Sequence, residues 1–182
     1  FPAGKTTAIV GMSGSGKTTL LKLLLGFYEP EKGDIKIGHT DLFNIRPKFW
    51  RMQCGVVMQD GFIFSDTIAN NIAVGDDYPN PAKLNEAVKI ANISDFIQSL
   101  PLGLQTKIGA EGNGISQGQK QRLLIARAIY KNPTYLFFDE ATNALDANNE
   151  SQIVENMNAF TKGKTVIVVA HRLSTVRNAH QI

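Results

Sequence analysis

The sequence predicts an α/β fold in which a mainly parallel sheet is flanked by helices. Short apolar or β-branched runs alternate with helical patterns along the chain, as in proteins whose parallel strands are joined by crossover helices. The chain has 182 residues, of which 43% are hydrophobic and 19% are charged. This composition is that of an ordinary globular protein, and the length suits one compact α/β domain or two small ones.

The predicted strands are short and mostly apolar. The first is followed by a helical pattern at 17–25. A turn at 31–34 leads into a short strand at 35–37, which we expect to form a partial antiparallel edge of the sheet. The main strands are predicted at 8–10, 55–58, 135–138 and 165–169.

The pattern changes between Gln59 and Gly114. Helix-like stretches at 81–91 and 95–100 are separated by Gly, Pro and Asn, and no long strand is evident. We interpret 1–182 as a single domain with a helical subdomain at about 61–130, inserted into a core formed by 1–60 and 131–182. Because the chain begins at Phe1, we expect it to be a piece of a longer protein.

Charge, cysteine content and hydropathy exclude several classes of protein. The net charge is +3 and no basic tail or patch stands out, so the sequence does not support binding to nucleic acid. The single cysteine, Cys54, rules out an internal disulfide, and we expect it to be a small buried apolar residue. No apolar run reaches the roughly 18–20 residues that a membrane-spanning helix needs.

The segment GMSGSGKT at 11–18 fits the phosphate-loop pattern G-x-x-x-x-G-K-S/T. It follows a predicted strand and precedes a predicted helix, so its backbone N–H groups and the helix N-terminus can surround phosphate oxygens. Lys17 would reach the β- and γ-phosphates of a nucleotide, and Thr18 would offer its hydroxyl to Mg²⁺. The alternative is a Gly-rich turn with an exposed lysine. The expected nucleotide-binding residues are Gly11, Ser13, Gly14, Ser15, Gly16, Lys17, Thr18 and Thr19.

Two adjacent acids, Asp139 and Glu140, end the apolar run of TYLFFDEAT. They would emerge at the carboxyl edge of the sheet, where ligands of open α/β sheets bind. We expect Asp139 to hold Mg²⁺ through water and Glu140 to polarise the attacking water. Acids that merely face solvent at a strand end are the alternative. With the phosphate loop, this pair predicts a P-loop NTPase that binds ATP and Mg²⁺.

The segment NGISQGQKQRLLIARAIY at 113–130 resembles the signature of ATP-binding cassette (ABC) ATPases, usually LSGGQ followed by a basic residue, Gln and Arg. Ser116 and Gln119 also form the pattern of a helix capping box. Glycine at position 118, in the first turn, lowers the stability of the helix. A ligand that approaches the backbone closely at this position would explain why a glycine is present. Two positions depart from the usual motif, Ile115 for Leu and Gln117 for Gly.

The other elements of that family follow in order. Gln59 resembles its Q-loop glutamine, 144–146 its D-loop, and His171 its switch histidine. The resemblance implies that Gln59 contacts Mg²⁺ or the lytic water, that His171 contacts the γ-phosphate and that Asp146 bridges to a partner domain. Each residue taken singly has a simpler alternative. Gln59 could be a surface glutamine, His171 a histidine at a strand end and Asp146 a surface acid.

The same resemblance implies a head-to-tail pair of domains. Ser116, Gly118 and Gln119 of one domain would close over the ATP held by the phosphate loop of the other, so that each copy alone holds half of a catalytic centre. We expect ATP hydrolysis to be coupled in this way to transport. The alternatives are a nucleotide-gated binding module with little hydrolysis and a soluble ABC protein that acts on nucleic acid or ribosomes.

Two segments resemble the exporter branch of the family. The stretch at 106–114 is similar to the exporter X-loop, although its acid is Glu111 rather than residue 110. Phe62, Ile63 and Phe64 suggest a docking site for a helix of the membrane domains, with ordinary core as the alternative. The closest resemblance is to bacterial peptidase-containing exporters of peptides or bacteriocins. It implies transmembrane domains as partners, no nucleic acid, and a place on the cytoplasmic face of the inner membrane.

Overall fold

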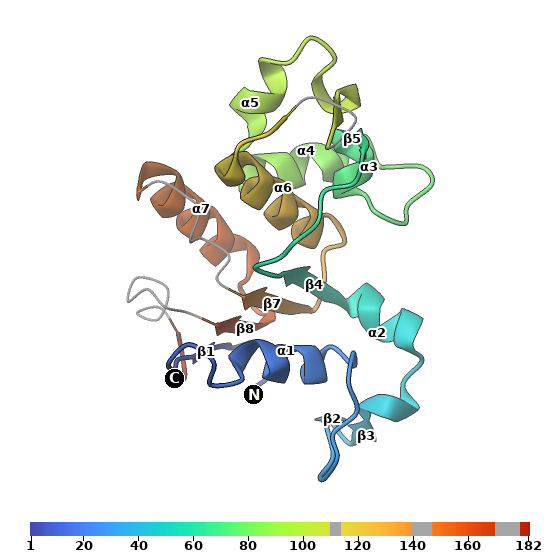
Figure 1. Cartoon of the computed structure of the whole chain (residues 1–182), viewed down its shortest axis with the longest axis vertical. Helices are drawn as coiled ribbons and strands as arrows, with labels where there is room; N and C mark the ends of the chain where they lie inside the picture. Colours follow the sequence, from blue (N-terminus) through green and yellow to red (C-terminus); the bar gives the residue numbers. More distant parts are fainter. Residues whose placement is uncertain (110–113, 140–146, 170–178) are drawn as a thin grey trace.

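The computed structural model describes residues 1–109, 114–139, 147–169 and 179–182. Its centre is a four-stranded sheet with the order β1-β8-β7-β4, and all three strand pairs are parallel (Figure 1). The α/β class with a parallel core is therefore confirmed. The predicted first strand is placed slightly too late, because Val10 lies beyond the end of β1 and is 51% exposed. The strands are β1 (Thr6–Ile9), β4 (Cys54–Val57), β7 (Tyr135–Asp139) and β8 (Thr165–Val169).

Helices cover both faces of this sheet. Alternate residues of a strand point to opposite faces, and accordingly Leu136 and Phe138 belong to one apolar cluster while Phe137 belongs to the other. The first cluster is shared with α3 (Ile68–Ile72), α4 (Pro81–Ile90), α5 (Ser94–Gln98), α6 (Gln117–Tyr130) and α7 (Ala147–Phe160). The second is shared with α1 (Lys17–Leu24) and α2 (Pro47–Gln53). The helices α1 and α6 thus lie on opposite sides of the sheet (Figure 1).

Two small antiparallel pairs accompany the parallel sheet. The strand predicted at 35–37 appears as β2 (Lys36–Ile37), which pairs with β3 (Thr40–Asp41). This pair forms a sheet of its own and not an edge of the main sheet, because among the described strands β2 pairs with β3 alone. The second pair, β5 (Asp66–Thr67) with β6 (Lys107–Ile108), was not predicted. Strands of two residues are too short for the alternation of apolar and polar residues to become visible.

Helices are the main regular elements described between β4 and α6, as predicted. Asn80 caps α4, since its side-chain oxygen accepts hydrogen bonds from the N–H groups of Ala82 and Lys83. The second predicted helix is shorter than expected, because α5 ends at Gln98. Two 3₁₀ turns complete the described elements, η1 (Leu42–Asn44) and η2 (Gly103–Gln105). In Figure 1 the helices α3, α4 and α5 lie at one end of the molecule, and β2 and β3 lie at the other.

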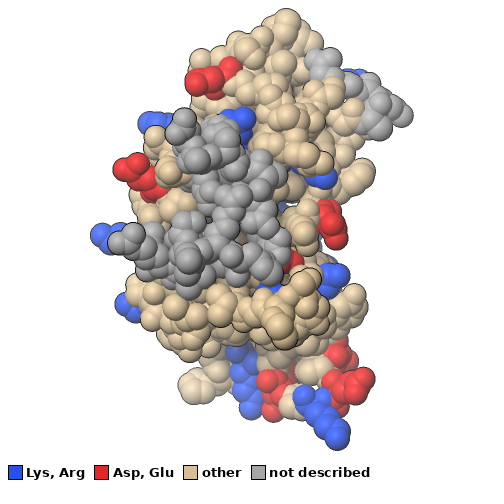
Figure 2. Space-filling view, turned by 60° about the vertical axis from the view of Figure 1, so that its left-hand side comes forward, with Lys and Arg blue, Asp and Glu red and all other residues tan. Residues whose placement is uncertain are grey.

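None of the helices in the described part of the chain is long and apolar enough to cross a membrane. On the face shown in Figure 2, lysine and arginine side chains lie beside aspartate and glutamate side chains. The excess of three positive charges is therefore not gathered into one patch on that face.

The thiol of Cys54 is buried, which confirms the expectation that it is a small core residue. Burial raises its pKa to about 12. The thiolate is the reactive form, so at pH 8 we expect the folded protein to react with an aromatic disulfide reagent at least about 10³-fold more slowly than the same protein in denaturant. Absorbance of the released thiolate measures both rates, and equal rates would contradict the buried placement.

Candidate active site

The four strands of the main sheet are parallel, so their carboxyl ends lie along one edge. The phosphate loop follows β1, Gln59 follows β4, and Asp139 is the last residue of β7. The edge therefore brings together three segments that are far apart in the sequence. This is the position at which open α/β sheets bind their ligands.

The phosphate loop has the backbone conformation that its glycines predict. Gly14 and Gly16 have φ angles of 78° and 88°, a region that other residues adopt only with strain. At Gly11 a Cβ atom would lie 2.8 Å from the hydroxyl oxygen of Ser15, so that this glycine allows the loop to close on itself. Ser13, Ser15 and Thr19 are exposed around the loop.

The ammonium group of Lys17 lies inside this loop. It donates hydrogen bonds to the carbonyl oxygens of Gly11 at 2.9 Å and of Met12 at 2.8 Å, and the residue is only 9% exposed. The alternative of a lysine that merely extends into solvent is therefore wrong. A positive charge enclosed by the loop in this way is suited to bind an anion.

The N-terminus of α1 provides further donors. Its first residue is Lys17 and its cap is Gly16, which has no side chain to accept hydrogen bonds from the first turn. The first turn also contains no acidic residue. The free N–H groups and the positive end of the helix dipole therefore both favour phosphate oxygens at this position.

A direct hydrogen bond joins the phosphate loop to the end of β7. The hydroxyl of Thr18 donates to Oδ2 of Asp139 at 2.7 Å, although the two residues are 121 positions apart. Asp139 is 2% exposed. Hydroxyl and carboxylate oxygens are the hard ligands that Mg²⁺ prefers, so this pair fits the cation expected with ATP.

Gln59 lies in the turn after β4 and is exposed. The neighbouring strands place it near the acid, because Val57 of β4 is paired with Phe138, the residue before Asp139. The structure thus brings Gln59, Thr18 and Asp139 to the same edge of the sheet.

The signature segment begins α6 as the capping box predicts. The hydroxyl oxygen of Ser116 accepts a hydrogen bond from the N–H of Gln119 at 3.2 Å, and Oε1 of Gln119 accepts one from the N–H of Ser116 at 2.8 Å. Ser116 and Gln117 are exposed, and Gly118 lies in the first turn. The side chain at the unusual position 117 therefore points to solvent, which leaves the helix cap intact.

Several predicted residues lie outside the described part of the chain. These are Glu140, Asp146 and His171, and also residues 110–113 of the X-loop-like segment. Their roles remain predictions from the sequence. Among the residues that the structure does describe, no group of three or more His, Cys, Asp or Glu side chains could hold a metal ion by itself.

The sequence analysis missed one charged residue that contacts the segment after Gln59. Arg127 of α6 donates hydrogen bonds to the carbonyl oxygens of Phe62 and Asn71, both at 2.7 Å. Phe62 and Phe64 are 65% and 46% exposed, whereas Ile63 packs against the core. The core alternative therefore applies to Ile63 alone. A single arginine within the apolar run LLIARAIY was the signal that could have found this contact.

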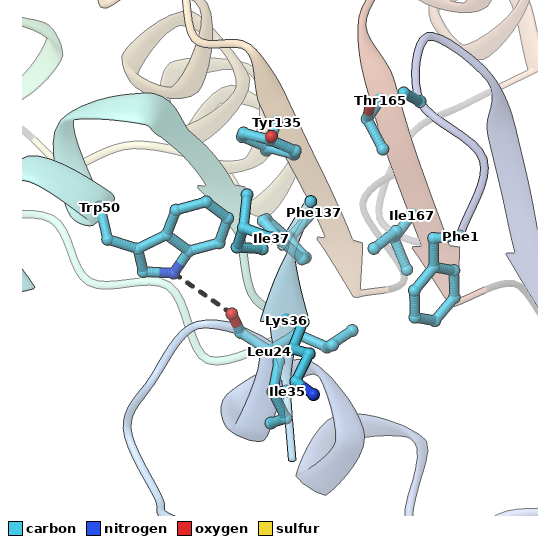
Figure 3. A pocket seen from close by; sticks show the side chains of 12 residues that line it. Phe1, Leu24, Ile35, Lys36, Ile37, Trp50, Tyr135, Phe137, Thr165 and Ile167 are labelled. Atoms are coloured by element: carbon cyan, nitrogen blue, oxygen red, sulfur yellow. Dashed lines mark hydrogen bonds between the residues drawn. The ribbon is translucent and has the colours of Figure 1, made fainter. Parts of the chain in front are cut away.

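A hollow of about 160 Å³ lies elsewhere, between β2 and the face of the main sheet (Figure 3). The indole N–H of Trp50 donates to the carbonyl oxygen of Leu24 at 3.2 Å, and its ring packs on Tyr135 with 4.9 Å between centroids. Tyr135 and Thr165, which line this mostly apolar hollow, begin β7 and β8 and so lie at the opposite end of the strands from Asp139.

Comparison with known proteins decides between the nucleotide-binding families. The family model described as ABC transporter matches residues 1–143. The chain belongs to the ABC transporter family. ATP-binding domains of ABC transporters are ATPases, and as a member of this family the domain binds ATP.

Related proteins identify the exporter type of ABC domain. The chain is 47% identical over 179 residues to the alpha-hemolysin translocation ATP-binding protein HlyB of Escherichia coli, covering 98% of the chain and 25% of that protein. It is 46% identical over 179 residues to the ATP-dependent lipid A-core flippase of Saccharophagus degradans, covering 98% of the chain and 30% of that protein.

A solved structure agrees with these sequence relationships. A bacterial Atm1-family ABC exporter with ATP bound superimposes with a TM-score of 0.91 and 44% sequence identity, over 97% of this chain and 31% of that one. This ABC domain therefore spans between a quarter and a third of the proteins just compared.

Proposed function

We propose that this chain binds Mg²⁺ and ATP at the carboxyl edge of its sheet and hydrolyses the nucleotide to drive an exporter. The observation that carries the proposal is the hydrogen bond between Thr18 and Asp139, which unites the phosphate loop with the acid that ends β7. The ABC family supports ATP as the nucleotide.

Each residue at this edge has one task in the proposed reaction. Lys17 and the N–H groups of the loop bind the β- and γ-phosphates, and Thr18, Asp139 and Gln59 hold Mg²⁺. When bound, the cation neutralises the charge that develops on the phosphate oxygens. Glu140 accepts a proton from the attacking water, and His171 contacts the γ-phosphate and orients that water.

The second half of the site comes from a partner domain in this proposal. Ser116, Gly118 and Gln119 close over ATP on the partner's phosphate loop, and Asp146 bridges the two domains. The opposite placement of α1 and α6 on the sheet supports a head-to-tail arrangement. The hydroxyl of Ser116 retains its own proton as a donor while it caps α6, so capping and phosphate binding are compatible.

The proposed membrane partner docks beside the Q-loop glutamine. Phe62 and Phe64 form an exposed edge-to-face pair with ring centroids 5.3 Å apart, and aromatic residues are enriched at protein interfaces. We propose that they receive a helix of the transmembrane domains at the cytoplasmic face of a bacterial inner membrane. HlyB, a translocation protein named for alpha-hemolysin, supports a peptide or protein as the cargo.

The proposed cation site predicts how a Thr18→Val variant behaves. The isosteric valine removes the hydroxyl and its bond to Asp139, so the Mg²⁺ concentration for half-maximal phosphate release should rise at least about tenfold. Steady-state phosphate release by the exporter, titrated with Mg²⁺ at saturating ATP, measures this shift. Thr40→Val on β3 is the matched control and should leave the titration unchanged. An unshifted titration of the Thr18 variant would remove this hydroxyl from the site.

A further inference from the structure

The segment that follows Gln59 is fastened to α6 at three neighbouring points. A Cβ atom on Gly61 would lie 2.3 Å from Cδ1 of Leu124, so the backbone here packs directly on that helix. One residue further, Nη1 of Arg127 donates to the carbonyl oxygen of Phe62 at 2.7 Å. The guanidinium of the same arginine lies 5.3 Å from the centre of the Phe64 ring.

Asn71 of α3 extends this attachment. Its side-chain oxygen accepts from the N–H of Phe64 at 2.8 Å and from Nη2 of Arg127 at 3.2 Å. Its amide nitrogen donates to the carbonyl oxygens of Phe64, Asp66 and Thr67, and the residue is 1% exposed. Arg127 also donates through Nε to the carbonyl oxygen of Asn71 at 2.7 Å. The two side chains thus hold the backbone from Phe62 to Thr67.

The geometry of these bonds requires an arginine. Three nitrogen atoms of one planar guanidinium donate to three acceptors, on Phe62 and Asn71, while its face contacts Phe64. A lysine carries the same charge on a single nitrogen and cannot reach these acceptors in the same plane. The interaction therefore depends on shape as well as on charge.

Gln59 lies between two fixed points. On one side it follows β4, whose last residue Val57 is paired with β7, and on the other it precedes Gly61 and Phe62, which are held by α6. We infer that Arg127 is a positioning residue that sets the place of Gln59 at the site by locking its segment onto α6. This inference rests on the proposed role of Gln59 in the reaction. If Arg127 has this role, the segment from Gln59 to Phe64 and the helix α6 move together.

The test is a double-mutant cycle on phosphate release by the exporter. Arg127→Lys should lower kcat about tenfold and leave the KM for ATP within about twofold, because the phosphate loop is untouched. In a Gln59→Ala background the same change should lower kcat by less than about twofold, because Arg127 acts through that glutamine. Equal fold-losses in both backgrounds would overturn the inference.

A matched control lies on the same helix. Tyr130 donates to Oδ2 of Asp76 at 2.6 Å and accepts from the N–H of Asn80 at 2.9 Å, so Tyr130→Phe also detaches a segment from α6, but not that of Gln59. It should leave kcat unchanged. Amide hydrogen exchange of 61–67 should become faster in the Arg127 variant and stay unchanged in the Tyr130 variant. Unchanged exchange in the Arg127 variant would also overturn the inference.

The outcomes separate the inference from the function on which it rests. A slow Gln59→Ala exporter with independent effects of Arg127 refutes the positioning role and leaves the proposed function intact. A Gln59→Ala exporter with normal turnover refutes the proposed role of the glutamine, and the positioning role fails with it.

Discussion

Replacing Lys17 by alanine is expected to lower kcat/KM for ATP by about 10²- to 10³-fold. The ammonium is enclosed by the phosphate loop, within 2.9 Å of the carbonyl oxygens of Gly11 and Met12. In the proposed complex it also faces the β- and γ-phosphates. A charge-assisted hydrogen bond is typically worth about 1.5–3 kcal/mol, and a cation placed where negative charge develops adds to this in the transition state.

Two measurements separate the effect of Lys17→Ala on ATP binding from its effect on the reaction. Equilibrium binding of a fluorescent ATP analogue reports the ground state, and phosphate release by the exporter reports the reaction. Lys22→Ala is the control, since it removes the same charge from the same helix, outside the loop. The control should behave like the unmodified protein, and a Lys17 variant with similar kinetics would mean that the loop does not bind the nucleotide.

Replacing Glu140 by glutamine is expected to lower kcat by about 10²- to 10⁴-fold, while ATP binding persists. Glutamine has nearly the shape of glutamate but cannot accept the proton of the attacking water at neutral pH. Since ATP then remains intact between the two domains, the proposal predicts that the variant accumulates as a closed, ATP-bound pair. Single-turnover phosphate release and cross-linking of the two domains measure the two effects.

The control for this second variant is Glu155→Gln on the exposed surface of α7. It makes the same change of charge away from the sheet edge, so turnover should not change. Undiminished hydrolysis by the Glu140 variant would assign the general base to another residue. A slow variant whose domains never close in saturating ATP and Mg²⁺ would instead refute the head-to-tail arrangement.

The two central strands, β7 and β8, were predictable because they are buried on both faces. The residues at 136–138 and 166–169 form apolar runs without polar interruption, as expected for a parallel sheet covered by helices on each side. The pair β5–β6 was not predictable, since each strand has two residues and the pairing joins segments about 40 residues apart. No pattern within either segment encodes such a contact.

The phosphate loop was predictable for a related reason. Its conformation is decided within eight residues, by glycines at the positions where the backbone turns through positive φ. The capping box of α6 is equally local, since Ser116 and Gln119 are three residues apart. Local motifs of this kind carry their own geometry, and the structure reproduces both.

The amino-acid sequence alone thus determined the class of fold, the phosphate loop and the start of the signature helix, because each depends on neighbouring residues. Only the tertiary structure decided which distant side chains meet. It joined Thr18 to Asp139. It also left Phe62 and Phe64 exposed, while Arg127 donates hydrogen bonds to the carbonyl oxygens of Phe62 and Asn71. The physical reason is that hydrogen bonds between remote segments depend on how the helices pack on the sheet, a property of the whole fold.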